Sequence, residues 1–190
     1  MSPILGIYAS QISGHLFAPS GAYDSIATTT VGSGGTTTIT FSSIPQTYTH
    51  LQLRVLQRGT GSGSNYTNKL QFNGDTTSAN YREHYLYGDG ASAVAGSVQQ
   101  WYIAQGAIPA AGNTSGIFGT AVVDILDYTN TSKNKVVRTL SGFDANGSGE
   151  IMFDSLLWIN TGAINQITME VYTTNFAQYS QIALYGIKGA

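Results

Sequence analysis

Apolar and polar residues alternate along the middle of the chain with the period of a β-strand. Leu51, Leu53 and Val55 share one parity, and Gln52 and Arg54 occupy the other. Successive side chains of a strand point to opposite faces of its sheet, so this pattern predicts a strand with one buried face. Similar short runs, separated by turn residues, continue to the end of the chain.

The segment 151–159 differs because it is apolar on both faces. One parity carries Ile151, Phe153, Leu157 and Ile159, and the other carries Met152, Leu156 and Trp158. A strand with two apolar faces is typical of a sheet centre or of the surface beneath a subunit contact. We therefore predict that Met152, Leu156 and Trp158 form a contact between the subunits of an oligomer.

Glycine and asparagine mark the turns between these runs. Residues 32–35 (Gly-Ser-Gly-Gly) separate two Thr-rich runs and predict a hairpin with a four-residue loop. Asn146-Gly147 predicts a second hairpin turn. The residues around it resemble the start of a calcium-binding loop, but Ser155 occupies the position of the closing glutamate, so the turn is preferred.

About ten predicted strands, with no helical stripe longer than two turns, indicate an all-β protein. We expect an antiparallel β-sandwich, with a jelly roll favoured over an immunoglobulin-type sandwich by the strand number and the uneven loops. We expect residues 1–22 to form an N-terminal arm and linker, and residues 23–190 to form the sandwich domain.

The N-terminal arm is apolar and carries no lysine or arginine. Its large apolar side chains are Ile4, Leu5, Ile7, Tyr8, Ile12 and Leu16. The missing basic region argues against a signal peptide, and no run of about 18 apolar residues predicts a transmembrane segment. We predict that the arm is an attachment segment held by another protein, as a strand or as a helical turn.

Composition narrows the possible partners. Charged residues make up only 9% of the 190 residues, and the net charge is −2, so the clustered basic residues that bind nucleic acid are missing. The chain has no cysteine, which excludes disulfides and thiol catalysis. A surface of hydroxyls and amides costs less to desolvate than a charged one and suits extensive contact between proteins.

Candidate chemistry is sparse. The three histidines, His15, His50 and His84, lack metal-ligand spacing. We therefore expect no catalytic residues, no metal site and no cofactor, and we expect that the protein is not an enzyme. A glycan-degrading hydrolase would need carboxylates brought together from different strands, and acidic side chains are scarce.

The segments "SPILGIYASQISGHL", "YDSIATTTVGSGGTTTITFSSIPQTYTHLQLR" and "QIALYGIKG" resemble small structural proteins of tailed-bacteriophage virions. The resemblance covers the first third and the last ten residues. It implies a virion protein made in the bacterial host cytoplasm, attached through residues 2–16 and exposed on the particle surface as a capsid decoration (cement) protein. It also implies a homo-oligomer, with a trimer expected, and contact with other virion proteins such as the major capsid protein.

The alternative is a tail or fibre component whose jelly roll binds a host-surface carbohydrate. Aromatic rings stack on sugars, and the candidate rings are Tyr81, Tyr85, Tyr87, Trp101 and Tyr102. The same residues could instead serve ordinary packing within a sheet, which is the commoner role of tyrosine there.

Overall fold

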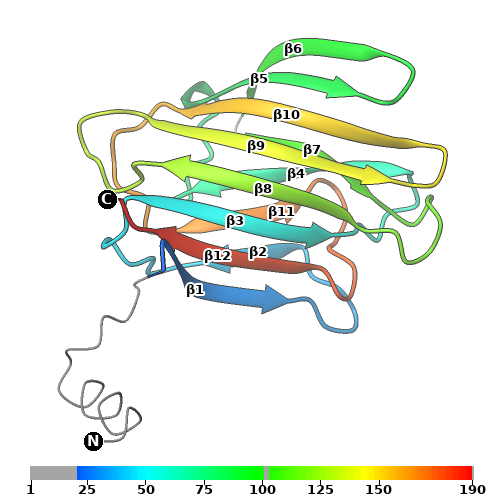
Figure 1. The fold of residues 1–190 in the computed structure, drawn as a ribbon, viewed down its shortest axis with the longest axis horizontal. Coiled ribbons are helices and arrows are strands. Elements are labelled where there is room, and N and C mark those ends of the chain that lie inside the picture. The colour runs from blue at the N-terminus through cyan, green and yellow to red at the C-terminus, as the bar shows by residue number, and fades with distance from the viewer. Residues whose placement is uncertain (1–20, 101–102, 190) are drawn as a thin grey trace, which may run out of the picture.

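The computed structural model describes residues 21–100 and 103–189 and places twelve strands in two antiparallel sheets (Figure 1). The larger sheet contains, in spatial order, β1 (Tyr23–Thr30), β12 (Gln181–Ile187), β3 (His50–Gln57), β8 (Gly119–Leu126), β9 (Lys135–Asp144), β10 (Gly149–Trp158), β5 (Tyr81–Gly88) and β6 (Ala93–Gln100). The smaller sheet contains β2 (Thr38–Phe41), β11 (Ile167–Val171), β4 (Asn65–Phe72) and β7 (Ile103–Pro109). The two sheets pack as a sandwich, which confirms the predicted fold class.

Helical structure is confined, within the described ranges, to the short 3₁₀ turn η1 (Ser78–Asn80). No helix in that part of the chain is long and apolar enough to cross a membrane. The sheet order supports the sandwich, and the jelly-roll connectivity expected within that class stays a prediction.

The core lies between the sheets and follows the predicted parity. Leu51, Leu53 and Val55 of β3 are buried, as are Met169 of β11 and Leu184 of β12. On β3 the apolar residues of one parity therefore face the smaller sheet, because burial of that face removes the most apolar surface from water.

The predicted hairpin around residues 32–35 is wrong. β1 pairs with β12 and β2 pairs with β11, so the glycine-rich segment crosses from one sheet to the other. Its glycines are nevertheless needed: Gly34 and Gly35 have φ of 97° and 73°, and a Cβ on Gly35 would lie 2.5 Å from the carbonyl oxygen of Phe176. Positive φ marks a sharp change of direction, and it does not specify which strands pair.

The turn at Asn146-Gly147 is confirmed as a hairpin. Asn146 and Gly147 have φ of 58° and 108°, and the flanking strands β9 and β10 pair along their whole length in continuous register. Two successive positive φ values fit the twist of an antiparallel pair, which is why Asn-Gly is favoured there. This register aligns the outer faces of both strands.

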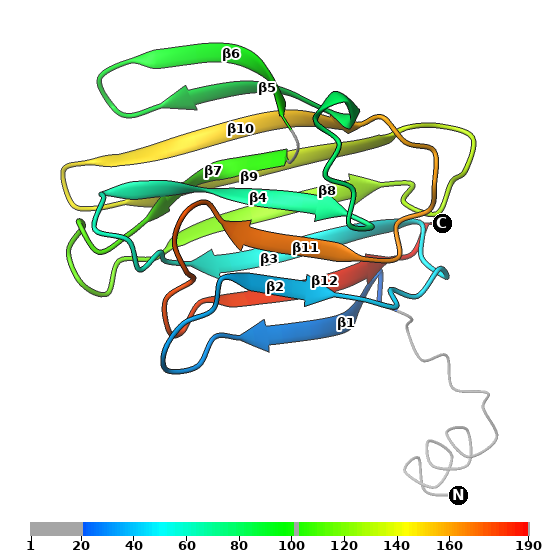
Figure 2. The ribbon, with the colours of Figure 1, turned by 180° about the vertical axis from the view of Figure 1, so that it is seen from behind.

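The two sheets differ in width, and the larger one extends beyond the smaller (Figure 2). β7 is the last strand of the smaller sheet, whereas β5 and β6 continue the larger sheet past it. Tyr81 and Glu83 at the start of β5 are still buried on the inner face, whereas Val98 on the inner face of β6 is exposed.

Candidate functional site: the outer face of the larger sheet

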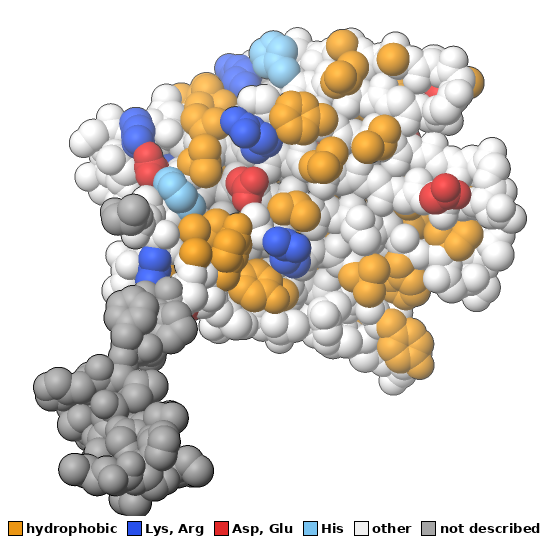
Figure 3. Space-filling view, in the orientation of Figure 1, with side chains coloured by type: hydrophobic (Ala, Val, Ile, Leu, Met, Phe, Trp, Pro, Cys, Tyr) orange, Lys and Arg blue, Asp and Glu red, His pale blue; other side chains and the backbone are white. Residues whose placement is uncertain are grey.

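The outer face of the larger sheet carries apolar side chains arranged in rows across the strands. Because paired residues of antiparallel strands point to the same side, the register aligns one row over β8, β9, β10, β5 and β6. That row consists of Val122, Leu140, Phe153, Leu86 and Ala95. Leu140, Phe153 and Leu86 are 52%, 45% and 53% exposed. Figure 3 shows this face, with apolar groups spread over it and charged and histidine side chains among them, mainly in the left half of the view.

A polar row runs beside this apolar row, displaced from it by two residues on each strand. It consists of Asp124, Arg138, Ser155, His84 and Ser97. On β3, Gln52 Nε2 donates to Asp124 Oδ1 at 2.7 Å, and Arg54 Nε donates to Gln52 Oε1 at 2.7 Å. These two bonds link Arg54, Gln52 and Asp124 across β3 and β8 at one end of the polar row.

A second apolar row borders the polar row on its other side, with Leu126, Val136 and Leu157 in register. A hollow of about 540 Å³ lies where this row meets the polar row, lined by Val136, Leu157, His84 and Ser155 among others. The face thus offers apolar stripes around a line of hydrogen-bonding groups, the mixture typical of protein interfaces.

The pair of Ser155 and His84 does not make a catalytic site. The two residues are opposite each other in register, but the next residue in the row beside His84 is Ser97. Serine catalysis needs a carboxylate that orients the histidine, and among the described residues the register places none beside His84 in this row. The described ranges also hold no group of three or more residues suited to a metal ion.

The predicted oligomer contact requires a correction. Leu156 and Trp158 are each 1% exposed and belong to the core, and Met152 is half-buried on the same inner face. The sequence separated the two faces of β10 correctly, but the face that is exposed to solvent is the other one, with Ile151 and Phe153. The reason is that the smaller sheet covers the face that carries the largest side chain.

A matched pair of alanine variants on β10 tests this assignment. Leu156→Ala should lower the free energy of unfolding by about 3 kcal/mol, because it leaves a cavity in the core. Phe153→Ala should change it by less than about 1 kcal/mol, since that ring is already solvated. Equilibrium urea unfolding measures both, and equal losses would contradict the assignment of faces.

Tyr81 also lies in the core and cannot serve as a sugar platform. It is 1% exposed and stacks on Trp158 with ring centroids 6.5 Å apart. Its hydroxyl donates to the Asp75 carbonyl at 3.0 Å and accepts from Phe72 N–H at 3.2 Å. Trp158 Nε1 donates to the Asp75 carboxylate at 2.7 Å. Both aromatic residues are therefore structural.

Tyr85 and Tyr87 are the half-exposed members of the predicted sugar platform. Their rings stack with centroids 6.2 Å apart on the inner face of β5. A Cβ on Gly96 would lie 2.5 Å from Tyr85 Oη, so the Tyr85 ring covers this glycine of β6. The remaining predicted residues lie outside the described side chains: Trp101 and Tyr102, and the attachment residues Ile4, Leu5, Ile7, Tyr8, Ile12 and Leu16.

A buried carboxylate on β10 is a feature that the sequence analysis missed. Asp154 is 0% exposed, and neither of its carboxylate oxygens has a hydrogen-bond partner among the described residues. Burial, followed by the negative charges of Glu83 and Glu150, raises the pKa of Asp154 to about 8. The hydroxyls of Thr139 and Ser141 on β9 are also buried without partners. The sequence could have indicated this burial, because Asp154 alternates with Leu156 and Trp158 and therefore points to the same inner face of β10.

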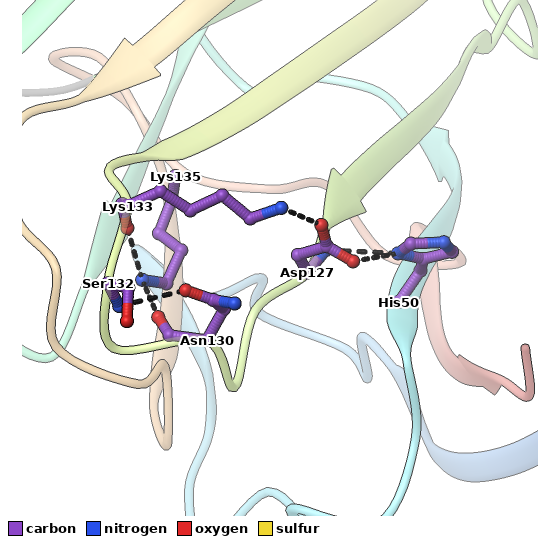
Figure 4. A network of polar contacts seen from close by, with 6 residues as sticks. All are labelled: His50, Asp127, Asn130, Ser132, Lys133 and Lys135. Atoms are coloured by element: carbon purple, nitrogen blue, oxygen red, sulfur yellow. Dashed lines mark hydrogen bonds and ion pairs between the residues drawn. The ribbon is translucent and has the colours of Figure 1, made fainter.

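A separate polar network orders the connection between β8 and β9 (Figure 4). The fully buried Lys135 donates from Nζ to the carbonyls of Asn130, Lys133 and Thr161 at 2.6, 3.1 and 2.9 Å. Burial, followed by the positive charge of Lys133, lowers the pKa of Lys135. These three bonds use every donor of the ammonium group, so Lys135 has a structural role.

The partly exposed end of this network contains His50 and Asp127. The Asp127 backbone N–H donates to His50 Nδ1 at 2.9 Å. Asp127 Oδ1 lies 3.4 Å from the same nitrogen. Lys133 contacts the Asp127 carboxylate, and its hydrogen bond is the main cause that lowers the pKa of Asp127.

The outer face thus has the character of a contact surface, and the buried groups serve the fold. No protein-family model matches the chain, and the comparison with curated proteins found no match.

Proposed function

We propose that this chain is a non-enzymatic structural protein of a tailed-bacteriophage virion, exposed on the particle surface as a capsid decoration protein. Residues 2–16 attach it to the particle, and the outer face of the larger sheet contacts a neighbouring virion protein such as the major capsid protein. The observation that supports this proposal best is the set of apolar rows on that face, around Leu140 and Phe153. Exposed apolar surface of this extent is typical of protein interaction sites.

Two features of the sequence support the same proposal. The low content of charged residues, 9%, keeps the desolvation cost of a large contact small. The resemblance of the N-terminal segment and the closing "QIALYGIKG" to phage structural proteins supplies the expected setting.

Deletion of residues 2–16 tests the attachment. The core cluster of described residues runs from Val31 to Leu184, so the truncated chain should unfold at the same temperature within about 2 °C. Its binding to particles that lack the protein should fall more than tenfold, since each large apolar side chain contributes about 1.5–3 kcal/mol when buried. Co-sedimentation with particles measures binding, and unchanged binding would refute the attachment role.

A double variant tests the outer face separately. Leu140→Ser/Phe153→Ser should stay folded, because both side chains are exposed, and should weaken co-sedimentation with the particle roughly tenfold or more. Thr28→Ser, on the same face at its opposite edge, serves as a matched control with no expected loss. If the double variant binds the particle as strongly as the wild type, the outer face does not have the proposed role.

The alternative, a carbohydrate-binding tail or fibre component, depends on the half-exposed stack of Tyr85 and Tyr87. Stacked rings at that spacing provide an apolar platform for a sugar. Binding on a glycan array that is lost in Tyr87→Ala would favour this alternative over the decoration protein.

A further inference from the structure

Within the described residues, the edge of the larger sheet at β6 lacks the protection that the other sheet edges have. A sheet edge exposes unpaired backbone N–H and C=O groups, and proteins normally block it with charges, bulges, proline or short strands. β6 pairs only with β5 among the described strands, over eight residues without a register shift. Its sequence, AVAGSVQQ, contains neither a charged residue nor proline.

Each of the other three edges carries such a device. β1 has a register shift between Ser25 and Ala27, and its Asp24 pairs with Lys188 at 2.7 Å. β2 has only four residues. β7 ends at Pro109, and its pairing with β4 shifts register. Because protection is present at three edges, its absence at β6 indicates an edge that pairs with another strand.

The pattern of β6 matches a second copy of the same strand. A twofold axis perpendicular to the sheet makes two β6 strands antiparallel and keeps both outer faces on one side. With the axis at Gly96, Val94 lies opposite the partner's Val98, and Ala95 lies opposite the partner's Ser97. These pairs are apolar with apolar and small with small, and the strand brings no like charges together.

We propose that two copies of this chain pair through β6 in antiparallel orientation, which joins the two larger sheets into one continuous sheet. The overhang of the β5–β6 hairpin beyond the smaller sheet (Figures 1 and 2) leaves room for the second copy on both faces. This dimer does not depend on the proposed function, because it forms from the purified chain without a particle.

A charge-swap experiment tests the pairing on the full chain. In Ala95→Lys/Ser97→Lys, and likewise in Ala95→Glu/Ser97→Glu, like charges oppose each other across the twofold axis. Each variant alone should dimerise at least tenfold more weakly than the wild type, and the 1:1 mixture should regain the dimer. Ala95 and Ser97 are exposed, and recovery on mixing shows that both variants are folded. Analytical ultracentrifugation measures the masses.

Val136→Lys is the matched control, since Val136 is exposed on β9, which is paired on both sides. It should dimerise like the wild type. Adding salt should weaken the mixed dimer more than the wild-type dimer, because screening acts on the introduced charges. A wild-type chain that is monomeric at about 1 mM would overturn the proposal. So would a trimer, or a dimer that survives both double variants and is lost in Val136→Lys.

Discussion

Asp154→Asn should stabilise the protein at alkaline pH, by about 5 kcal/mol at pH 9. The carboxyl of Asp154 is fully buried, with no hydrogen-bond partner in the part of the chain that the structure describes, and its pKa is raised to about 8 in the folded state. An unfolded aspartate has a pKa of about 3.9, and each pKa unit corresponds to about 1.4 kcal/mol. The amide of asparagine fills the same space without a charge.

The sign of the pH dependence follows from proton binding. Between about pH 4 and pH 8 the folded chain keeps the Asp154 proton that the unfolded chain has lost, so the wild type loses stability as the pH rises through this window. Below about pH 4 both states are protonated, and the difference between wild type and variant should be small and constant. Above about pH 8 it should be large and constant.

Urea unfolding of both proteins from pH 4 to pH 9 measures this difference. Asp144→Asn is the control, because Asp144 is exposed and the asparagine oxygen can still accept from the Asn146 N–H as the carboxylate does at 2.7 Å. That control should shift stability by less than about 0.5 kcal/mol at every pH. A difference for Asp154→Asn that does not change with pH would show that the carboxyl is not protonated in the folded protein.

Lys135→Met should lower the free energy of unfolding by about 3–5 kcal/mol. The substitution keeps the buried chain volume but removes the donor for three carbonyls, those of Asn130, Lys133 and Thr161. A buried acceptor left without a partner costs about 1–3 kcal/mol. The connection between β8 and β9 should therefore lose its order, and with it part of the sheet.

Lys133→Met is the matched control two residues away. Lys133 is exposed and forms a surface ion pair with Asp127, which contributes at most about 1 kcal/mol. Urea unfolding of the two variants should therefore give clearly different midpoints. Similar midpoints would mean that the buried ammonium does not hold the carbonyls against water.

The local features of the fold could be read from the sequence, and the pairing of distant strands could not. Alternation placed Leu51 and Leu53 inside, and Asn146-Gly147 predicted its hairpin turn. The Thr-rich runs on either side of Gly34 looked like a hairpin because turn residues indicate a change of direction only. Their partners, β12 and β11, lie more than a hundred residues away, and no local pattern encodes that distance.

The candidate site shows the same division. The two parities of β10 were separated correctly, but which of them faces solvent depends on where the smaller sheet packs. Leu156 and Trp158 proved to be core, and Phe153 belongs to the outer face. The rows of that face depend on the register of five strands, for example Leu140 opposite Phe153. Register is set by contacts between strands and is not visible in any one strand.

The position of β12 has a consequence for the order of folding. β1 and β3 do not pair with each other, and both pair with β12. During synthesis β1 and β3 therefore stay without this common neighbour until β12 has been made, and this part of the larger sheet forms only after residue 187 has left the ribosome. Folds dominated by such distant pairings form slowly, over milliseconds to seconds. The nascent chain has to stay unaggregated for that time.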